Sequence, residues 1–201
     1  MSIKILDYHK NIGNFLNEEV YKNNYHIIFL DWDDTVISTS CLKNIEFKFR
    51  NEREKYDIIK NFKNEYENKY CLGLYILTYR QNIFDIQAEA VELGIAEYLK
   101  CSQYKIKRTD KYNRVGAAIC VNIDCSKIAV LEEIVNEDRK LSNNVTIYFV
   151  DDNIQNITTS FLTTKFNDNL LLYFYPLSDT DKRITDRLKN NKNKLLQYFK
   201  K

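Results

Sequence analysis

The chain has 201 residues, a net charge of +2 and a hydrophobic fraction of 44%, which fit one soluble globular domain spanning residues 1–201. So small a net charge gives no argument of its own for a nucleic-acid or membrane partner. No apolar run approaches the roughly 18 residues of a membrane-spanning helix, so a membrane segment is not expected.

The cysteine and histidine pattern argues against a zinc site. The five cysteines form no CxxC pair and only two histidines are present, so the usual ligand spacing is missing. The amino terminus lacks the continuous apolar segment of a secretory signal. An odd number of cysteines then favours reduced thiols, and we expect an intracellular, cytoplasmic protein.

The hydrophobic pattern of the first third predicts two helices and two strands. Residues 11–23 have apolar side chains near helical spacing, whereas residues 27–31 form a continuous apolar run typical of a strand buried on both faces. Residues 45–49 alternate between apolar and charged, which is typical of a half-exposed strand or hairpin arm. Residues 51–69 predict an amphipathic helix, whose core-facing stripe is expected to be Tyr56, Ile59, Phe62 and Tyr66.

The rest of the chain continues the alternation of strands and helices. A strand at 71–77 and a helix at 83–93, ended by Gly94, precede a third, shorter strand that residues 95–101 lead into. Residues 103–124 are ambiguous, because their apolar part at 115–121 suits a strand or a helix. The remaining expected elements are a helix at 127–140 capped by Ser126, a strand at 145–150, a short helix, a strand at 170–175 and a basic helical tail at 181–201. This order predicts an α/β protein with a mainly parallel sheet.

Polar side chains stand where three of these strands end. They are Asp31 and Asp33, Thr78, and Asp151 and Asp152. The carboxyl ends of parallel strands share one edge of the sheet, so these residues should converge there. Two carboxylates about 4 Å apart repel by roughly 4 kcal/mol at an effective dielectric near 20, so the cluster needs a cation. Oxygen ligands without histidine or thiolate favour Mg²⁺.

Four short motifs, in this order, resemble those of the haloacid dehalogenase-like (HAD) phosphatase superfamily. Asp31-Trp32-Asp33-Asp34-Thr35-Val36 matches its DxDxT motif, Ile76-Leu77-Thr78 its second, Lys127 its third and Asp151-Asp152 its fourth. The resemblance covers residues 27–153. It implies a three-layer Rossmann-like sheet with helices on both faces and, in this chain, little or no cap domain.

The resemblance also implies a role for each of these residues. Asp31 would be the nucleophile that forms an aspartyl-phosphate, and Asp33 the general acid and then base. Thr78 and Lys127 would hold the phosphoryl oxygens, with Lys105, Lys107 and Lys111 as rival candidates for the lysine. Asp151 and Asp152 would anchor Mg²⁺ directly or through water, with Asp31 and the Asp33 backbone carbonyl as further ligands.

Two further positions stand out beside the motifs. Asp34 replaces the glycine that many relatives carry, and we interpret it as a bystander. Arg80 lies two residues after Thr78 and is expected to bind the substrate phosphate with two hydrogen bonds. The Thr-x-Arg pattern also resembles the 3′-phosphatase domains of nucleic-acid repair enzymes.

These patterns predict a Mg²⁺-dependent phosphomonoester hydrolase. Residues 37–70 and 103–124, where a cap domain would be inserted, are short, so an open site and a bulky substrate are expected. A nucleic-acid 3′-phosphate or a phosphoprotein fits better than a sugar phosphate. Two alternatives stay open: a non-catalytic binding module that uses the basic tail and residues 103–124, and a phosphotransferase with the same intermediate.

Overall fold

A computed structural model describes residues 3–6, 11–37, 52–137, 145–166 and 169–175 of the chain. The strand or hairpin arm expected at 45–49 and the basic helix expected at 181–201 lie outside these residues. Within them, no helix is long and apolar enough to cross a membrane.

The centre of the fold is an eight-stranded sheet with the order β1-β8-β7-β2-β3-β6-β5-β4. The first six strands of this order pair in parallel, whereas β5, near one edge, pairs antiparallel with both of its neighbours, β6 and β4. The expected mainly parallel α/β sheet is therefore confirmed. The strands are β1 (Ile3–Ile5), β2 (His26–Leu30), β3 (Cys71–Thr78), β4 (Ile106–Arg108), β5 (Tyr112–Val115), β6 (Ala118–Val121), β7 (Thr146–Asp151) and β8 (Leu170–Phe174).

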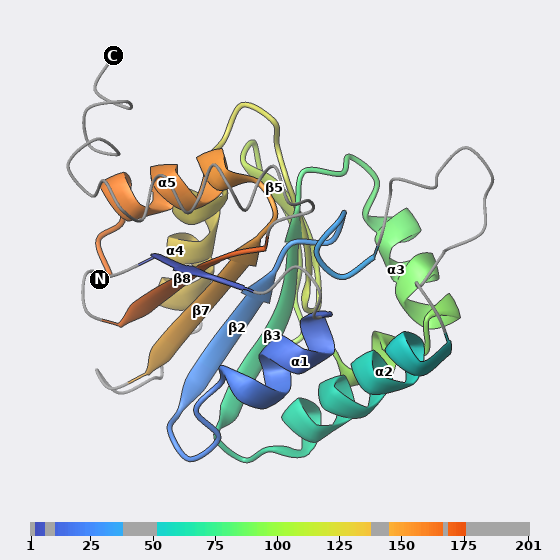
Figure 1. Cartoon of the computed structure of the whole chain (residues 1–201). Helices are drawn as coiled ribbons and strands as arrows, with labels where there is room; N and C mark the ends of the chain where they lie inside the picture. Colours follow the sequence, from blue (N-terminus) through green and yellow to red (C-terminus); the bar gives the residue numbers. More distant parts are fainter. Residues whose placement is uncertain (1–2, 7–10, 38–51, 138–144, 167–168, 176–201) are drawn as a thin grey trace.

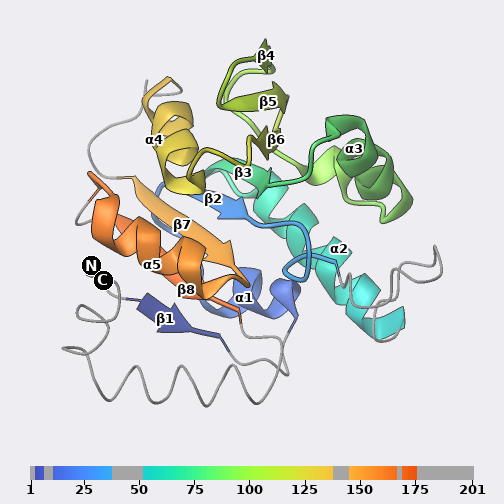
Figure 2. The same ribbon diagram turned by 90° about the horizontal axis from the view of Figure 1, so that it is seen from above.

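Helices cover both faces of the sheet. One face carries α1 (Ile12–Glu18), α2 (Glu52–Glu67) and α3 (Ile83–Glu92), and the other carries α4 (Lys127–Glu137) and α5 (Ile154–Thr163), as Figures 1 and 2 show. Parallel strands need such crossovers, and a strand between two helical layers must be apolar on both sides. All five residues of β2 are accordingly buried.

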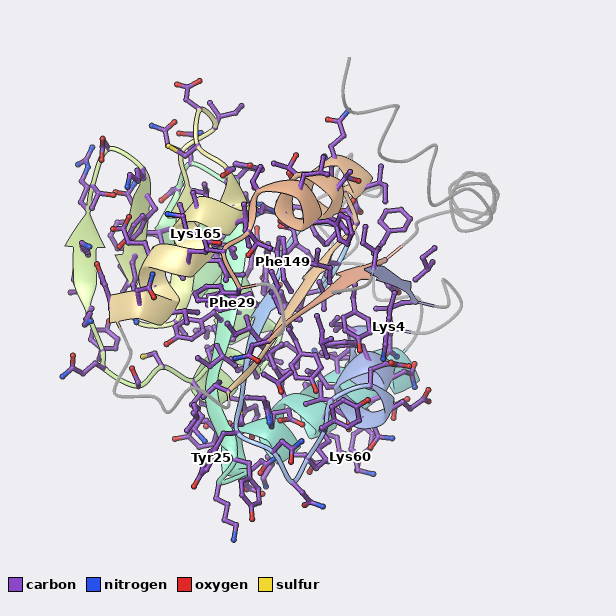
Figure 3. All side chains as sticks on the ribbon, turned by 90° about the vertical axis from the view of Figure 1, so that its left-hand side faces the viewer. Lys4, Tyr25, Phe29, Lys60, Phe149 and Lys165 are labelled. Atoms are coloured by element: carbon purple, nitrogen blue, oxygen red, sulfur yellow. The ribbon has the colours of Figure 1, made fainter. Side chains whose placement is uncertain are left out.

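The side chains of β2 divide the core into two clusters. Ile28 and Leu30 belong to the cluster that contacts α1, α2 and α3, whereas Ile27 and Phe29 belong to the cluster under α4 and α5. Phe149 of β7 lies in the second cluster with Phe29, and both are labelled in Figure 3. Alternation along a strand produces this division, because successive side chains point to opposite faces.

The expected core stripe of α2 is confirmed for Phe62, which is buried, and for Ile59, which packs against the core, but it is wrong for both tyrosines. Tyr56 and Tyr66 are 66% and 45% exposed, whereas Ile58, Phe62 and Glu65 are buried. These three stand at i, i+4 and i+7, so they share a face of the helix. The charge of Glu65 concealed this face in the sequence, because an unpaired glutamate is almost never fully buried.

Two other regions bear on the predictions made from the sequence. Residues 95–101 contain the 3-10 helix η1 (Ala96–Tyr98) and an isolated bridge between Lys100 and Leu74, and the short strand that follows them, β4, begins only at Ile106. The ambiguous 103–124 region forms β4, β5 and β6, which extend the sheet. The short edge strand β1 was not predicted, since three residues carry too little periodicity.

Candidate active site

The expected polar strand ends do meet at one edge of the sheet. In that sheet β2 lies between β7 and β3, with Leu30 level with Val150 and with Ile76. The Asp31 amide then donates to the Val150 carbonyl at 2.9 Å, which holds the start of the loop against the end of β7. Asp31 therefore follows β2 directly, while Thr78 and Asp151 are the last residues of the adjacent strands β3 and β7.

Three carboxylates form a compact cluster at this edge. Asp31, Asp151 and Asp152 each offer an oxygen, and these oxygens lie within 4.8 Å of one another. Asp31 and Asp151 are buried, and Asp152 is half-buried. Carboxylates leave water only when a cation or hydrogen bonds compensate them, so the cluster needs partners.

Lys127 supplies one of these partners. Its buried ammonium group lies 2.7 Å from Asp31 Oδ1 and 2.8 Å from Asp151 Oδ2. Lys127 is the first residue of α4, preceded by Ser126, whose hydroxyl accepts from the Ala129 amide at 3.4 Å. The expected cap therefore places the lysine at the carboxyl ends of β2 and β7.

The first turn of α5 fixes Asp151. Its Oδ1 accepts from the Asn153 amide at 2.8 Å, and the Asn156 side-chain amide donates to both of its oxygens at 3.1 Å. Asn153 in turn caps α5 by accepting from the Gln155 amide. The sequence analysis did not predict a role for Asn156. The sequence indicates its contact with Asp151 only by the spacing of five residues, and that spacing becomes meaningful once a helix is known to begin at residue 154.

Burial and like charge shift the pKa values of the cluster. Burial raises the pKa of Asp31 well above its usual range, Lys127 offsets part of this, and Asp151 adds to it. Burial and the neighbouring Asp151 also raise the pKa of Asp152 to about 6. For Lys127, burial opposes the charge, but the carboxylates of Asp31 and Asp151 outweigh it and raise its pKa.

The donor set fits a hard divalent cation. Three carboxylates face a single ammonium, so a negative excess remains in a largely buried place. The three candidate ligands offer oxygen alone, which suits Mg²⁺ better than Zn²⁺. Asp33 is expected to bind Mg²⁺ through its backbone carbonyl, and that contact stays a prediction.

The Asp33 carboxylate is held by Arg80. The guanidinium Nε lies 3.0 Å from both Asp33 oxygens, and Nη2 lies 2.6 Å from Oδ1. Arg80 also pairs through Nη1 with Glu89 of α3, and Glu89 Oε2 accepts from the Trp32 indole at 2.6 Å. Arg80, expected to hold substrate phosphate, thus contacts the predicted general acid. Glu89 was missed, since nothing in the sequence links it to the motifs.

Thr78 lies at the end of β3 and is buried. Its hydroxyl accepts from the Arg80 amide at 3.3 Å, which shapes the turn that leads to Arg80. The next residue, Tyr79, donates its hydroxyl to the Cys125 carbonyl at 3.0 Å, and its ring centre lies 5.0 Å from the Lys127 nitrogen. The Thr78–Arg80 segment therefore packs against the start of α4.

The rival lysines lie elsewhere. Lys107 and Lys111 approach Glu133 at 3.2 and 3.1 Å, and Lys105 lies 3.8 Å from Glu137. All three pair with glutamates on the flank of α4, so Lys127 is the lysine of the acidic cluster.

Asp34 has a positive φ of 57°. This left-handed conformation explains why glycine suits the position, and aspartate is one of the residues that tolerate it.

Comparison of the chain with known protein families, curated proteins and solved structures finds no match.

Proposed function

We propose that this chain is a Mg²⁺-dependent phosphomonoester hydrolase of the HAD-like superfamily, with its three-layer fold and little or no cap. The observation that carries the proposal is the position of Lys127 between Asp31 and Asp151. A carboxylate nucleophile for a phosphoryl group requires a positive partner and a nearby site for a cation. Lys127 is the partner of Asp31, and the acidic cluster is the site.

Asp31 would make the first bond. One of its carboxylate oxygens attacks phosphorus, the bond to the leaving oxygen breaks, and an aspartyl-phosphate forms. Lys127 opposes the effect of burial on the Asp31 carboxylate and would draw negative charge from the phosphoryl oxygens. In the second step water attacks phosphorus, the Asp31–phosphorus bond breaks and phosphate leaves.

Asp33 would move the proton in both steps. Its side chain is 33% exposed, so the leaving group and water can approach it. It gives a proton to the leaving oxygen and later accepts one from the attacking water. Arg80 orients this carboxylate through two of its nitrogens, which favours a single direction of approach.

Asp31, Asp151 and Asp152 would hold Mg²⁺, which neutralises the cluster and supplies positive charge near the transferred phosphoryl group. Asn156 and the Asn153 amide hold the Asp151 carboxylate in one orientation through their hydrogen bonds.

The expected small cap bears on the substrate class. Residues 106–121 belong to the sheet through β4, β5 and β6, so this stretch supplies no separate cap domain. An open site can accept a phosphate on a large molecule, so we propose a nucleic-acid 3′-phosphate or a phosphoprotein as the substrate.

The first experiment measures phosphate release from an aryl phosphate with and without Mg²⁺. We expect turnover that needs Mg²⁺, and a loss of at least about 10³-fold in Asp31→Asn, since an amide is a poor nucleophile. Asp34→Asn is the matched control, because it removes a neighbouring charge outside the cluster and should remain active. An Asp31→Asn variant as active as the parent chain would overturn the proposal.

A second assay compares a 3′-phosphorylated oligonucleotide, a phosphopeptide and a sugar phosphate. Higher kcat/KM on either large substrate supports the open site. A preference for the sugar phosphate would contradict it. Transfer of phosphate to an added alcohol in place of water would identify a phosphotransferase.

A further inference from the structure

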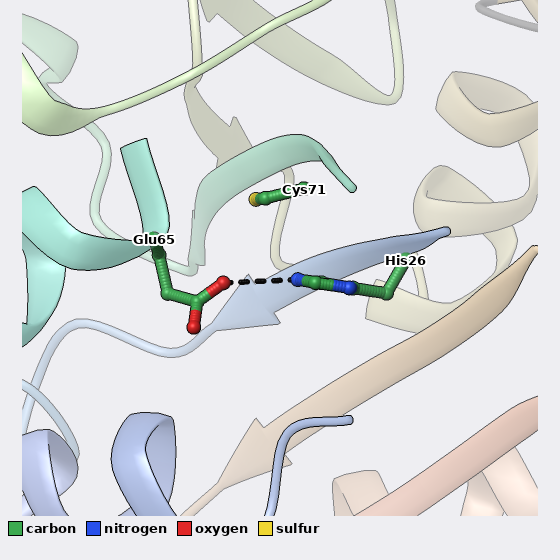
Figure 4. A group of neighbouring side chains, drawn as sticks. All are labelled: His26, Glu65 and Cys71. Carbon is green, nitrogen blue, oxygen red and sulfur yellow. Dashed lines mark hydrogen bonds and ion pairs between the residues drawn. The ribbon is translucent and has the colours of Figure 1, made fainter. Parts of the chain in front are cut away.

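A second cluster of ligand-type side chains lies at the opposite end of β2 and β3. His26 is the first residue of β2, Cys71 is the first residue of β3, and Glu65 lies in the last turns of α2. All three are buried, and their ligand atoms lie within 4.8 Å of one another. Figure 4 shows the Glu65 carboxylate pointing to the His26 ring, with Cys71 beside them.

Both ring nitrogens of His26 face hydrogen-bond acceptors. Nδ1 lies 2.7 Å from the Asn24 carbonyl oxygen, and Nε2 lies 2.9 Å from Glu65 Oε2. A neutral imidazole has one N–H, so it can satisfy only one of these contacts. The other contact then sets a nitrogen lone pair against an oxygen lone pair. A cation, either a proton or a metal ion, is needed there.

The orientation of the His26 ring suits a metal ion as the cation. With its N–H donated to the Asn24 carbonyl, the ring turns its free Nε2 toward Glu65 and Cys71. Histidines that bind metals typically donate their other N–H to a backbone carbonyl in this way.

Charge in the cluster is compatible with a divalent ion. Lys22 pairs with Glu65 Oε1, which leaves Oε2 to face the ring. Cys71 Sγ lies 3.6 Å from the Gly73 carbonyl, a weak contact that a thiol can give up when it binds a metal. On binding, the thiol would release its proton to solvent and remain as a thiolate ligand.

We propose that His26 Nε2, Glu65 Oε2 and Cys71 Sγ form a Zn²⁺ site, with water in the fourth position. Mixed nitrogen, oxygen and sulfur donors suit zinc, whereas the all-oxygen cluster near Asp31 does not. Such an ion would tie α2 to the beginnings of β2 and β3. The ligands stand 39 and 6 residues apart, so no spacing motif reveals them, and the absence of a zinc site expected from the sequence does not hold under this proposal.

The test uses the full-length protein, stripped with a chelator and titrated with Co²⁺ as a spectroscopic probe for zinc. We expect one Co²⁺ per chain to give a sulfur-to-cobalt charge-transfer band, whereas any Co²⁺ bound by the acidic cluster gives none. Cys71→Ser should abolish that band and weaken binding at least about 10- to 100-fold, the range found when even an outer partner of a metal ligand is removed. Cys120→Ser, at another buried cysteine, and Asp31→Asn, in the acidic cluster, should both keep the band.

X-ray absorption of the wild-type protein with one equivalent of Zn²⁺ provides a second measurement that does not depend on a variant. One sulfur at about 2.3 Å and nitrogen or oxygen neighbours at about 2.0–2.2 Å support the site. A shell without sulfur, no cobalt band, or a band that persists in Cys71→Ser would overturn it. In that event the cation at His26 is a proton.

Discussion

Glu89 links the two polar segments beside the acidic cluster through one carboxylate. Its Oε1 pairs with Arg80, and its Oε2 accepts from the indole of Trp32, the residue between Asp31 and Asp33. Arg80 in turn donates a hydrogen bond to Asp33. Glu89 touches neither of these aspartates in the described contacts, so we regard it as a positioning residue for Arg80 and the loop.

We predict that Glu89→Gln lowers kcat on an aryl phosphate by about 10- to 100-fold while KM changes little, because a small misplacement of a catalytic group has effects of this size. The substitution keeps the shape of the side chain and removes its charge. Steady-state kinetics tests it, with Glu92→Gln, an exposed position on the same helix, as the control. Equal kcat values for the two variants would show that Glu89 has no positioning role.

At Asp34 the backbone conformation itself makes a prediction. A side chain at φ 57° is strained, and glycine has no such strain. Asp34 also adds to the raised pKa of Asp152, so removing its charge relieves repulsion in the cluster. Asp34→Gly should raise the free energy of unfolding by about 0.5–1 kcal/mol in urea denaturation. A loss of stability would mean that the Asp34 side chain makes a contact worth more than the strain.

At the scale of elements, α2 shows how a buried charge changes the register that a helix adopts. Its inner face is Ile58, Phe62 and Glu65, and the glutamate is compensated by His26 and Lys22. Tyr56 and Tyr66 carry their rings on the outer side. The helix therefore gives up two aromatic side chains to solvent while it buries one charge that has partners.

This register predicts unequal costs for two truncations in the same helix. Phe62→Ala should destabilise the protein by about 3–5 kcal/mol, because it empties a fully buried site. Tyr56→Ala should stay within about 0.5 kcal/mol, since the ring is exposed. Urea unfolding of both variants measures the difference, and similar losses would restore the register first expected from the sequence.

At the scale of the whole molecule, the core on the α1–α3 side of the sheet holds buried groups that ionise at high pH. Burial raises the pKa of the Cys120 thiol to about 12 and that of the Tyr148 hydroxyl to about 12. In the unfolded chain a thiol ionises near pH 8.5 and a tyrosine near pH 10. Above those values the unfolded state loses protons that the folded state keeps.

The protein should therefore lose stability as the pH rises above about 9. Each such group costs up to about 1.4 kcal/mol per pH unit between its unfolded and folded pKa, and the full stability is present below the unfolded value. Denaturation between pH 8 and 11 tests this, and Cys120→Ala should flatten the dependence by the share of one group. A flat profile for the parent chain would show that these groups ionise equally in both states.

The sequence by itself determined the features that depend on local pattern. Continuous apolar runs predicted β2, β3 and β7, and Ser126 predicted the start of α4, so Asp31, Asp151 and Lys127 could be expected at one edge of the sheet. Because neighbouring strands pair in parallel, their carboxyl ends meet at one edge of the sheet. The predicted catalytic roles of these residues rest on resemblance and await the activity assay.

Tertiary structure alone decided which side chains touch. The packing of helices over the sheet determines three contacts: the ion pairs of Arg80 with Asp33 and Glu89, and the hydrogen bond between His26 and Glu65. Whether a charged side chain can be buried depends on compensating partners from segments far apart in the chain, whereas a sequence pattern contains only near neighbours. Buried Glu65 shows the consequence, because its side chain is stable in the core only with partners that lie 39 and 43 residues earlier in the chain.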